Sequence, residues 1–206
     1  MIGVEEAGGL RTLRIDRPDK ANSLTREMLE ALDAAVAQAT ADDVPALALA
    51  GAGTVFSAGA DLAEAKAGLA TDPVWERLSD RIARFPGLSV AALNGTLAGG
   101  AFGMALACDL RVAVPEAAFF YPVMKLGFLP QPSDPGRLAA LVGPARAKML
   151  LMASRRIDAE TALGWGLVDM IVPREALDDT VADLAAPALA APADIRRAIK
   201  ASIPPA

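Results

Sequence analysis

The sequence predicts an α/β fold built on a mainly parallel sheet. Short apolar segments typical of buried strands alternate with longer segments that have a helical stripe of apolar residues. Glycine-rich stretches join some of these strands to the helices that follow them. Of the 206 residues, 53% are hydrophobic and 22% are charged, which is typical of a packed globular protein. The length fits one domain, or one domain with a small appendage.

The first elements are a strand, a helix and a buried strand. Residues 10–15 alternate in polarity and predict the first strand. A helix is predicted over residues 23–40, where Ser23 or Thr25 can cap its first turn. Its apolar stripe recurs every four positions, at Leu24, Met28, Leu32 and Val36. The apolar run at residues 44–53 predicts a buried parallel strand.

The middle of the chain repeats this alternation. Residues 71–85 predict an amphipathic helix, with Asp72 as its cap and Pro73 at its first position. Two further buried strands are predicted at residues 88–95 and 109–115, with a helix at 98–107 between them.

The remaining third is mainly helical. Residues 134–154 predict two helical pieces broken at Gly143-Pro144. Residues 158–173 predict a helix capped by Asp158, then a turn and a short strand. The alanine-rich stretch 175–203 predicts helices separated by prolines.

Composition excludes several functions. The chain has no histidine, which excludes Ser-His-Asp catalysis and His-ligated metal sites. Its net charge is −5 and no basic cluster is interleaved with aromatics, so no nucleic-acid partner is expected. The single cysteine, Cys108, fits a reducing compartment, and we expect a cytoplasmic protein. Residues 87–108 carry no charge, but their glycines and Asn94 favour a buried strand and helix over a membrane span.

Two glycine-rich segments share one local design. Residues 53–65 and 93–107 each pass from a strand through small residues into the start of a helix. Small residues let a ligand approach the backbone, and free N–H groups at a helix start can bind an oxyanion. The first turn offers the Ala60 N–H, with Asp61 as helix cap, and the second offers the Gly100 N–H. Neither segment has the spacing of the common phosphate-binding motifs.

Four stretches together resemble the enoyl-CoA hydratase/isomerase (crotonase) superfamily. These are "RPDKANSLTREMLEAL", "FSAGADL", "LNGTLAGGAFGMALACDLRVA" and "ASRRIDAETALGWGLVDMIVP". The resemblance implies a spiral of ββα turns with two roughly perpendicular sheets. The crotonase-like core is expected over residues 1–175 and a short C-terminal helical segment over 176–206, so that the C-terminal helical region is shortened.

The resemblance also implies a ligand and a site. It implies an acyl-CoA thioester as substrate, no separate cofactor, no membrane partner, and a homotrimer or hexamer. The oxyanion hole transfers to the N–H groups of Ala60 and Gly100. The substrate-binding residues are expected to be Ala58, Gly59, Asp61, Leu62, Lys66 and Gly99.

Both carboxylates of the usual hydratase site are absent. The family's first glutamate position is Gly103 here, and the second is Val123. Neither residue can move a proton. Two side chains remain as candidates for that role, and the substrate itself is a third possible source. Tyr121 is predicted to share a side of an extended stretch with Val123 and Lys125. Its alternative is a half-buried aromatic whose hydroxyl reaches solvent. Asp134 is the other candidate, although an aspartate before a proline is more often a helix cap.

Two functions follow from these residues. The first is an acyl-CoA enzyme that stabilises a thioester enolate, with isomerisation or other enolate chemistry favoured over hydration. The alternative is a catalytically inactive acyl-CoA-binding or assembly homologue. Several other residues have plainer interpretations: Glu64 on a solvated helix face, Trp75 and Trp165 in packing, and Cys108 as a small buried residue.

Overall fold

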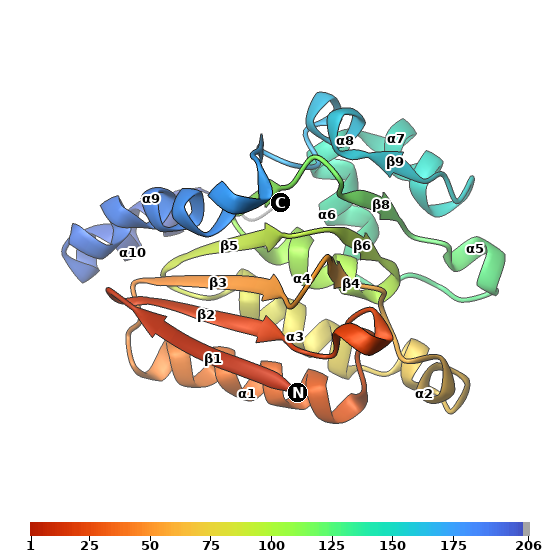
Figure 1. Cartoon of the computed structure of the whole chain (residues 1–206), viewed down its shortest axis with the longest axis horizontal. Coiled ribbons are helices and arrows are strands. Elements are labelled where there is room, and N and C mark those ends of the chain that lie inside the picture. The colour runs from red at the N-terminus through yellow and green to blue at the C-terminus, as the bar shows by residue number, and fades with distance from the viewer. Residues whose placement is uncertain (204–206) are drawn as a thin grey trace.

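Two β-sheets form the centre of the molecule. The computed structural model describes residues 1–203, and Figure 1 shows the larger sheet crossing the middle of the view. Its strands, in hydrogen-bonding order, are β1 (Ile2–Ala7), β2 (Leu10–Ile15), β3 (Ala46–Gly51), β5 (Leu88–Leu93), β7 (Leu110–Ala113) and β10 (Met170–Ile171). Every neighbouring pair is parallel except β1 and β2, which are antiparallel.

The second sheet is smaller and continues from the carboxyl ends of the first. Its strands, in order, are β4 (Val55–Ser57), β6 (Thr96–Ala98), β8 (Ala118–Phe120) and β9 (Ile157–Asp158). The first three are parallel and β9 is antiparallel to β8. Because β4 and β6 follow β3 and β5 almost directly, each chain segment passes from one sheet into the other.

Helices cover both sides of the larger sheet. In Figure 1, α1 lies below the sheet, α3 and α4 are seen behind its strands, and α9 and α10 lie at its upper left. The α-helices are α1 (Arg26–Ala41), α2 (Leu62–Lys66), α3 (Val74–Ala83), α4 (Phe102–Ala107), α5 (Val123–Leu126), α6 (Asp134–Val142), α7 (Pro144–Leu151), α8 (Ala159–Trp165), α9 (Leu177–Ala190) and α10 (Ala193–Ala201). Short 3-10 helices are η1 (Pro18–Lys20), η2 (Leu69–Thr71), η3 (Gly99–Ala101) and η4 (Arg174–Ala176).

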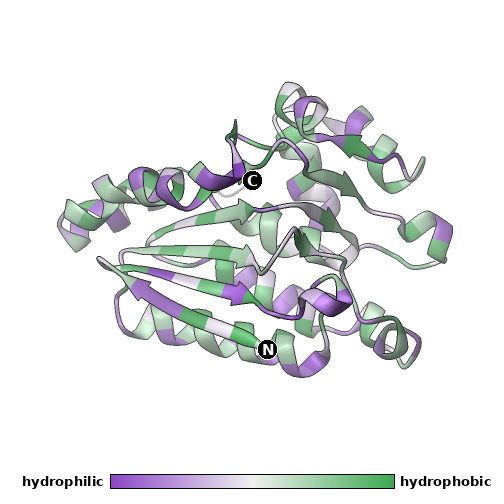
Figure 2. Cartoon of the chain, in the orientation of Figure 1, coloured by the Kyte–Doolittle hydropathy of each residue, from purple (hydrophilic) through white to green (hydrophobic). Residues whose placement is uncertain are grey.

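The core lies between the sheets and the helices. All six residues of β3 are buried, and Figure 2 shows β3 and β5 as largely apolar. Strands covered on both faces need apolar side chains throughout, which explains their continuous apolar runs. Among the described residues, no helix is long and apolar enough to cross a membrane. The uncharged stretch 87–108 instead forms β5, β6, η3 and α4.

The predicted α/β class and most predicted elements are confirmed. The structure corrects two expectations. The strand β1 was not predicted, because four of its six residues are exposed and it lacks a buried alternating face. Residues 123–126 are helical, so the predicted extended stretch carrying Tyr121, Val123 and Lys125 on one side is wrong. Residues 204–206 of the expected C-terminal segment lie outside the described residues.

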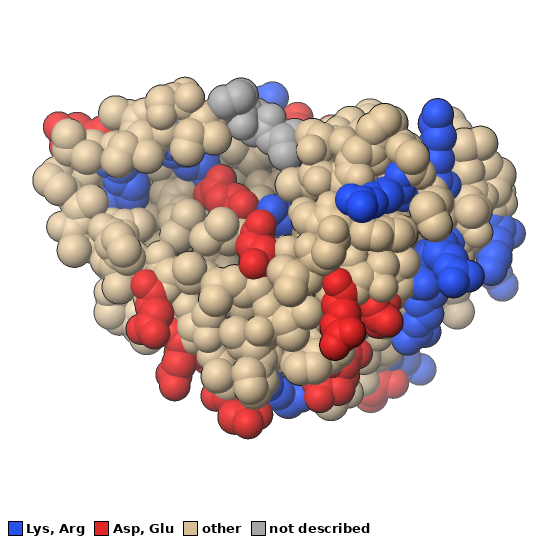
Figure 3. All heavy atoms as spheres, turned by 90° about the horizontal axis from the view of Figure 1, so that it is seen from above, with Lys and Arg blue, Asp and Glu red and all other residues tan. Residues whose placement is uncertain are grey.

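Charge is unevenly distributed over the surface. Figure 3 views the molecule from above, and its Lys and Arg side chains gather at the end that carries α7 and β9. The exposed basic residues of that region are Arg146, Lys148, Arg155 and Arg156. The guanidinium of Arg156 lies 5.2 Å from the ring centroid of Phe120, and that of Arg146 lies 5.5 Å from Trp165.

Candidate active site

The two predicted turns lie side by side. They follow the carboxyl ends of β4 and β6, which are neighbouring parallel strands with Ser57 opposite Leu97. Gly59 of the first turn lies directly against the second turn. A Cβ atom built on Gly59 would lie 2.9 Å from the Ala98 carbonyl oxygen and 3.4 Å from the Gly100 nitrogen. Its φ of +90° also disfavours any side chain, so glycine is required here on two grounds.

The backbone of the first turn directs the Ala60 N–H away from its neighbour. Ala60 forms an isolated parallel bridge with Leu24. The Leu24 N–H donates to the Gly59 carbonyl at 2.8 Å, and the Asp61 N–H donates to the Leu24 carbonyl at 2.8 Å. In a parallel ladder the residue between two such bonds points its own N–H to the opposite side. The Ala60 N–H is therefore available to another acceptor.

The second turn presents the Gly100 N–H at the start of a helix. Gly100 is the second residue of η3, where backbone N–H groups lack an acceptor within the helix. The indole ring of Trp75 packs against it, and a Cβ on Gly100 would lie 3.3 Å from that ring. Trp75 is only 3% exposed, and its Nε1 donates to the Leu69 carbonyl at 2.8 Å. The predicted packing role of Trp75 is confirmed.

A buried carboxylate occupies the space beside Gly103. A Cβ built on Gly103 would lie 2.9 Å from Oδ1 of Asp134, which comes from the first turn of α6. Asp134 has no exposed surface, and its Oδ1 has no hydrogen-bond partner within residues 1–203. Gly103 lies three residues after Gly100, so both share one helix face about one turn apart. The carboxylate thus lies near the second turn.

Tyr121 holds the other oxygen of this carboxylate. Its hydroxyl donates to Oδ2 of Asp134 at 2.7 Å and accepts the Gln131 N–H at 3.4 Å. The phenol ring stacks on Phe102, with centroids 5.3 Å apart, and Tyr121 is 2% exposed. Burial and the nearby Asp134 carboxylate raise the pKa of Tyr121, so it stays a hydrogen-bond donor.

Burial also changes the acidity of Asp134. Loss of hydration raises its pKa to about 7, although the Tyr121 hydrogen bond and the Arg137 charge act in the opposite direction. A carboxyl group that titrates near neutral pH can both accept and return a proton. A buried carboxyl group with a pKa perturbed in this way is a candidate catalytic acid or base.

The structure overturns the two plainer interpretations of these residues. Asp134 is not the helix cap: Ser133 is the N-cap residue of α6, and the Asp134 carboxylate bonds Tyr121 instead of the α6 backbone. The Tyr121 hydroxyl does not reach solvent, because it bonds Asp134. The sequence offered both residues but not their contact. The α5 helix and the loop after it bring them together across 13 positions, and no local pattern encodes that approach.

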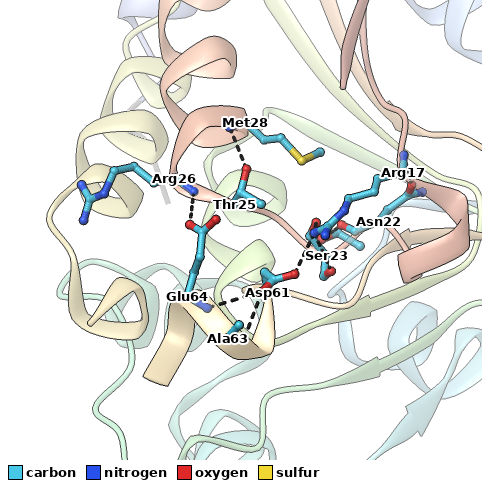
Figure 4. Close-up of polar contacts among 10 residues, drawn as sticks. Arg17, Asn22, Ser23, Thr25, Arg26, Met28, Asp61, Ala63 and Glu64 are labelled. Carbon is cyan, nitrogen blue, oxygen red and sulfur yellow. Dashed lines mark hydrogen bonds and ion pairs between the residues drawn. The ribbon is translucent and has the colours of Figure 1, made fainter. Parts of the chain in front are cut away.

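The other predicted binding residues surround the first turn. Ala58, Leu62 and Lys66 are exposed, Leu62 by 77%, whereas Gly59 is buried and Gly99 is half-buried. The carboxylate of Asp61 caps α2 by accepting the N–H groups of Ala63 and Glu64, as predicted. Its other oxygen accepts from Arg17 at 2.8 Å, an ion pair that sequence reasoning missed (Figure 4).

Glu64 is half-exposed on α2 and makes one contact that the sequence did not indicate. Its Oε2 accepts the backbone N–H of Arg26 at 2.7 Å, so Glu64 binds the first turn of α1 from α2 (Figure 4). Thr25, one of the two predicted caps, is the N-cap residue and accepts the Met28 N–H at 3.2 Å. Cys108 is buried, as predicted, and burial raises the pKa of its thiol to about 12.

Comparison with known proteins identifies the family. A model of the enoyl-CoA hydratase/isomerase family matches residues 5–204. The chain belongs to this family. It is 33% identical over 209 residues to 4-chlorobenzoyl coenzyme A dehalogenase-2 of Arthrobacter sp, covering 97% of this chain and 76% of that protein. It is also 33% identical over 187 residues to 1,2-epoxyphenylacetyl-CoA isomerase of Escherichia coli (strain K12), covering 86% and 71%.

Solved structures agree with this assignment. This hydratase/isomerase family member superposes on an enoyl-CoA hydratase from Bacillus anthracis with a TM-score of 0.91 and 30% identity, covering 98% of this chain and 81% of that one. The crotonase fold expected from the sequence is therefore confirmed. The names of these relatives describe a dehalogenase, an isomerase and a hydratase. Family membership alone thus does not choose the reaction.

Proposed function

We propose that this protein acts on an acyl-CoA thioester through an enolate, with Asp134 as the group that moves the proton. The single observation that carries this proposal is the position of the Asp134 carboxylate in the space beside Gly103, about one helical turn from Gly100. In this scheme, the N–H groups of Ala60 and Gly100 bind the thioester oxygen. Two such donors are what an oxyanion hole requires.

The chemistry is a proton transfer at carbon. Oδ1 of Asp134 removes a proton from the carbon next to the thioester carbonyl, and the C–H electron pair moves into the enolate. The negative charge then rests on the oxygen held by the two N–H groups. Asp134 returns the proton to the same carbon or, in an unsaturated acyl chain, to the carbon two positions further along. The second outcome shifts the double bond and is an isomerisation.

The hydrogen bond from Tyr121 determines which carboxylate oxygen of Asp134 is free to exchange the proton. Its hydroxyl engages Oδ2, so Oδ1 is the oxygen left free to exchange a proton. The raised pKa of Tyr121 suits a hydrogen-bond donor and not a second proton carrier. With a single carboxyl group at this position, isomerisation or another enolate reaction is favoured over hydration. Hydration additionally needs a positioned and activated water, and the two family glutamate positions are Gly103 and Val123.

The rest of the ligand is assigned to the first turn. The exposed Ala58, Leu62 and Lys66 lie on and after this turn, where the CoA part of the substrate would bind. Lys66, at the end of α2, would reach a CoA phosphate. No cofactor beyond the CoA of the substrate is needed for this chemistry. The homotrimer or hexamer implied by the family is part of the same proposal.

One observation favours a second function, acyl-CoA binding without catalysis. Asp134 has no exposed surface, so a substrate reaches Oδ1 only if a neighbouring segment moves. If that movement does not occur, the Tyr121–Asp134 pair is a buried structural contact. The protein would then bind the thioester in the oxyanion hole without transforming it.

Assays of two substrates separate these functions. The protein is incubated with 3-butenoyl-CoA and with crotonyl-CoA, and the products are separated by chromatography. The enolate function predicts conversion of 3-butenoyl-CoA to crotonyl-CoA, and a loss of roughly 10²-fold or more in Asp134→Asn. No conversion of either substrate, together with calorimetric binding of a CoA thioester, would establish the binding function instead.

A further inference from the structure

The first turn is held by a loop from the start of the chain. Residues 17–25, called here the 17–25 loop, run alongside it (Figure 4). The Ala58 N–H donates to the Ala21 carbonyl at 3.0 Å, and Leu24 bonds the backbone on both sides of Ala60. The direction of the Ala60 N–H is therefore set by the position of this loop.

The loop has a defined and strained conformation. Ala21 and Asn22 both lie in the left-handed region, with φ of 50° and 53°. Such backbone persists only where surrounding contacts determine it. The fully buried Asn22 supplies them: its Oδ1 accepts the Arg17 N–H, and its Nδ2 donates to the carbonyls of Ala52 and Val55. The Asn22 carbonyl in turn accepts the Ser57 hydroxyl at 2.8 Å.

One guanidinium connects the loop to the turn directly. The Nη1 atom of Arg17 lies 2.8 Å from Oδ2 of Asp61, and also within 3.3 Å of the carbonyl and hydroxyl oxygens of Ser23. The side chains of Arg17 and Asp61 are 26% and 19% exposed. Because Oδ1 of Asp61 caps α2, both carboxylate oxygens are engaged within the protein. Asp61 has no oxygen left free of protein partners for a substrate.

We propose that Arg17 and Asp61 are positioning residues whose ion pair fixes the direction of the Ala60 N–H toward the thioester oxygen. Asp61 follows Ala60 directly, and Leu24 bonds the backbone of both Gly59 and Asp61, so a shift of Asp61 relative to the 17–25 loop also shifts the backbone that carries the Ala60 N–H. Oxyanion stabilisation depends on donors placed in advance, and displacements of about 1 Å cost roughly 10²-fold in rate. The proposal rests on the proposed function in one respect, that Ala60 binds a thioester carbonyl.

The charge of the pair supports this role. The Arg17 hydrogen bond is the main reason that the pKa of Asp61 lies below its ordinary value, and the α2 N–H groups add to the effect. Asp61 is thus held as an anion, which strengthens both of its contacts. Within residues 1–203 the second turn has no comparable pair, and it is held by Trp75 and by the helix that follows it. Breaking the pair should therefore impair one donor and leave the other in place.

Carbon-13 NMR of a bound thioester reads the oxyanion hole without requiring turnover. The probe is butyryl-CoA labelled at the carbonyl carbon, a saturated thioester with no double bond to move. Hydrogen bonds to the oxygen polarise the carbonyl and move its resonance downfield on binding. We expect Arg17→Gln and Asp61→Asn each to lose about half of that shift, since one of two donors is displaced. The double variant should lose no more than either single variant.

Two further variants make the result specific. Asn is a good N-cap, so Asp61→Asn keeps α2 while it weakens the pair, and it decides the matter alone if Arg17→Gln does not fold. Arg11→Gln breaks ion pairs with Glu6 and Asp42 away from the turn, and should leave the full shift. Asp134→Asn should also leave the full shift, since Asp134 moves the proton and does not hold the oxygen.

The outcomes separate this inference from the proposed function. A full shift in both Arg17→Gln and Asp61→Asn overturns the positioning role, even if the wild-type enzyme isomerises 3-butenoyl-CoA. A wild-type shift that both variants reduce supports the positioning role, even if no substrate is converted. A bound thioester with no shift in the wild-type protein overturns it as well, because the Ala60 N–H then binds no carbonyl.

Discussion

The turns after β4 and β6 each present a backbone N–H group, from Ala60 and from Gly100, but different contacts hold the two turns in place. The first is held by polar contacts at the edge of the molecule, with Asp61 bound by Arg17 at 2.8 Å and Ala60 flanked by Leu24. The second is held by apolar packing inside it, with Gly100 against the buried ring of Trp75. One support comes from the start of the chain and the other from α3 and α4.

The two turns therefore differ in exposure: the first adjoins an accessible surface, and the second adjoins a buried carboxyl group. The exposed first turn leaves Ala58 and Leu62 accessible to a long polar ligand. The helix after the second turn, α4, is fully buried, and burial raises the pKa of the neighbouring Asp134 to about 7. The glycines of η3 and α4 leave space for neighbouring side chains. Trp75 packs against Gly100, and the Asp134 carboxylate lies beside Gly103. Neighbouring helices α3 and α6 thus supply side chains at the glycines of η3 and α4.

Gly59 joins the two turns, and replacing it should have the largest effect. In Gly59→Ala, the new Cβ meets the Ala98 carbonyl and the Gly100 nitrogen at a φ of +90°. We expect roughly a 10³-fold loss of isomerisation rate, because both donors are displaced. Gly68→Ala is the matched control, since Gly68 has a φ of +108° but nothing within 4 Å of a new Cβ. Equal rates in the two variants would refute the account.

The Asp134 carboxyl group should lower the free energy of unfolding by an amount that depends on pH. Its pKa is raised from 3.8 to about 7, so the folded state binds its proton more tightly than the unfolded state between those pH values. The free energy of unfolding therefore falls as pH rises from about 4 to 7 and is constant above. Asp134→Asn removes this term and should be more stable by about 4 kcal/mol at pH 8, with the advantage vanishing near pH 4.

Urea unfolding at both pH values measures that difference. Asp33→Asn is the contrasting variant, because Asp33 is paired with Arg77 and Arg81 and its loss should destabilise the fold at pH 8. An Asp134→Asn protein that is less stable than wild type at pH 8 would mean that the carboxylate is a structural contact.

Gly103→Ala tests the space that the carboxylate occupies. The added Cβ would lie 2.9 Å from Oδ1 of Asp134, so the carboxylate must shift away from the second turn. We expect isomerisation to fall by roughly 10²-fold, with little change in CoA-thioester affinity. Gly136→Ala on α6 adds a methyl group in open space and should retain the rate. Stopped-flow rates and calorimetric affinities supply the comparison.

Trp75→Phe should have the smallest effect of the series. The smaller ring keeps an aromatic surface under Gly100 but loses the hydrogen bond to the Leu69 carbonyl. We expect about a tenfold loss of rate, because the second turn loosens without losing its donor. Trp165→Phe on α8 is the control, and it should leave the rate unchanged. A loss after Trp165→Phe as large as after Trp75→Phe would argue against a specific support.

The sequence predicted the parts of the fold that have a regular pattern. The strands β3, β5 and β7 follow short apolar runs, and the strand β2 and the helices α1 and α3 follow apolar periodicity. The strand β1 was not predicted because it is largely exposed. The strands β4, β6 and β8 were not predicted because each has only three residues. A three-residue strand is too short to show an alternating pattern.

The site residues also differ in how far local sequence predicts them. The turns of Ala60 and Gly100 were predictable because small residues at the end of a strand are a local signal. Tyr121 and Asp134 were candidates, but their contact depends on a loop that returns from α5 to α6. The Asp-Pro pattern favoured a cap, and burial of the carboxylate against Gly103 overrode that preference. The Arg17–Asp61 ion pair joins residues 44 positions apart, so no local sequence pattern indicates it.

The pH dependence of proton exchange at the substrate tests the central role of Asp134 most directly. Butyryl-CoA is incubated with the protein in heavy water, and deuterium at the carbon next to the carbonyl is followed by mass spectrometry. The base must be ionised, so we predict exchange that rises with pH through about 7 and then levels off, and that is lost in Asp134→Asn. Equal exchange in wild type and Asp134→Asn, or none in the wild type although the thioester binds, would contradict the account.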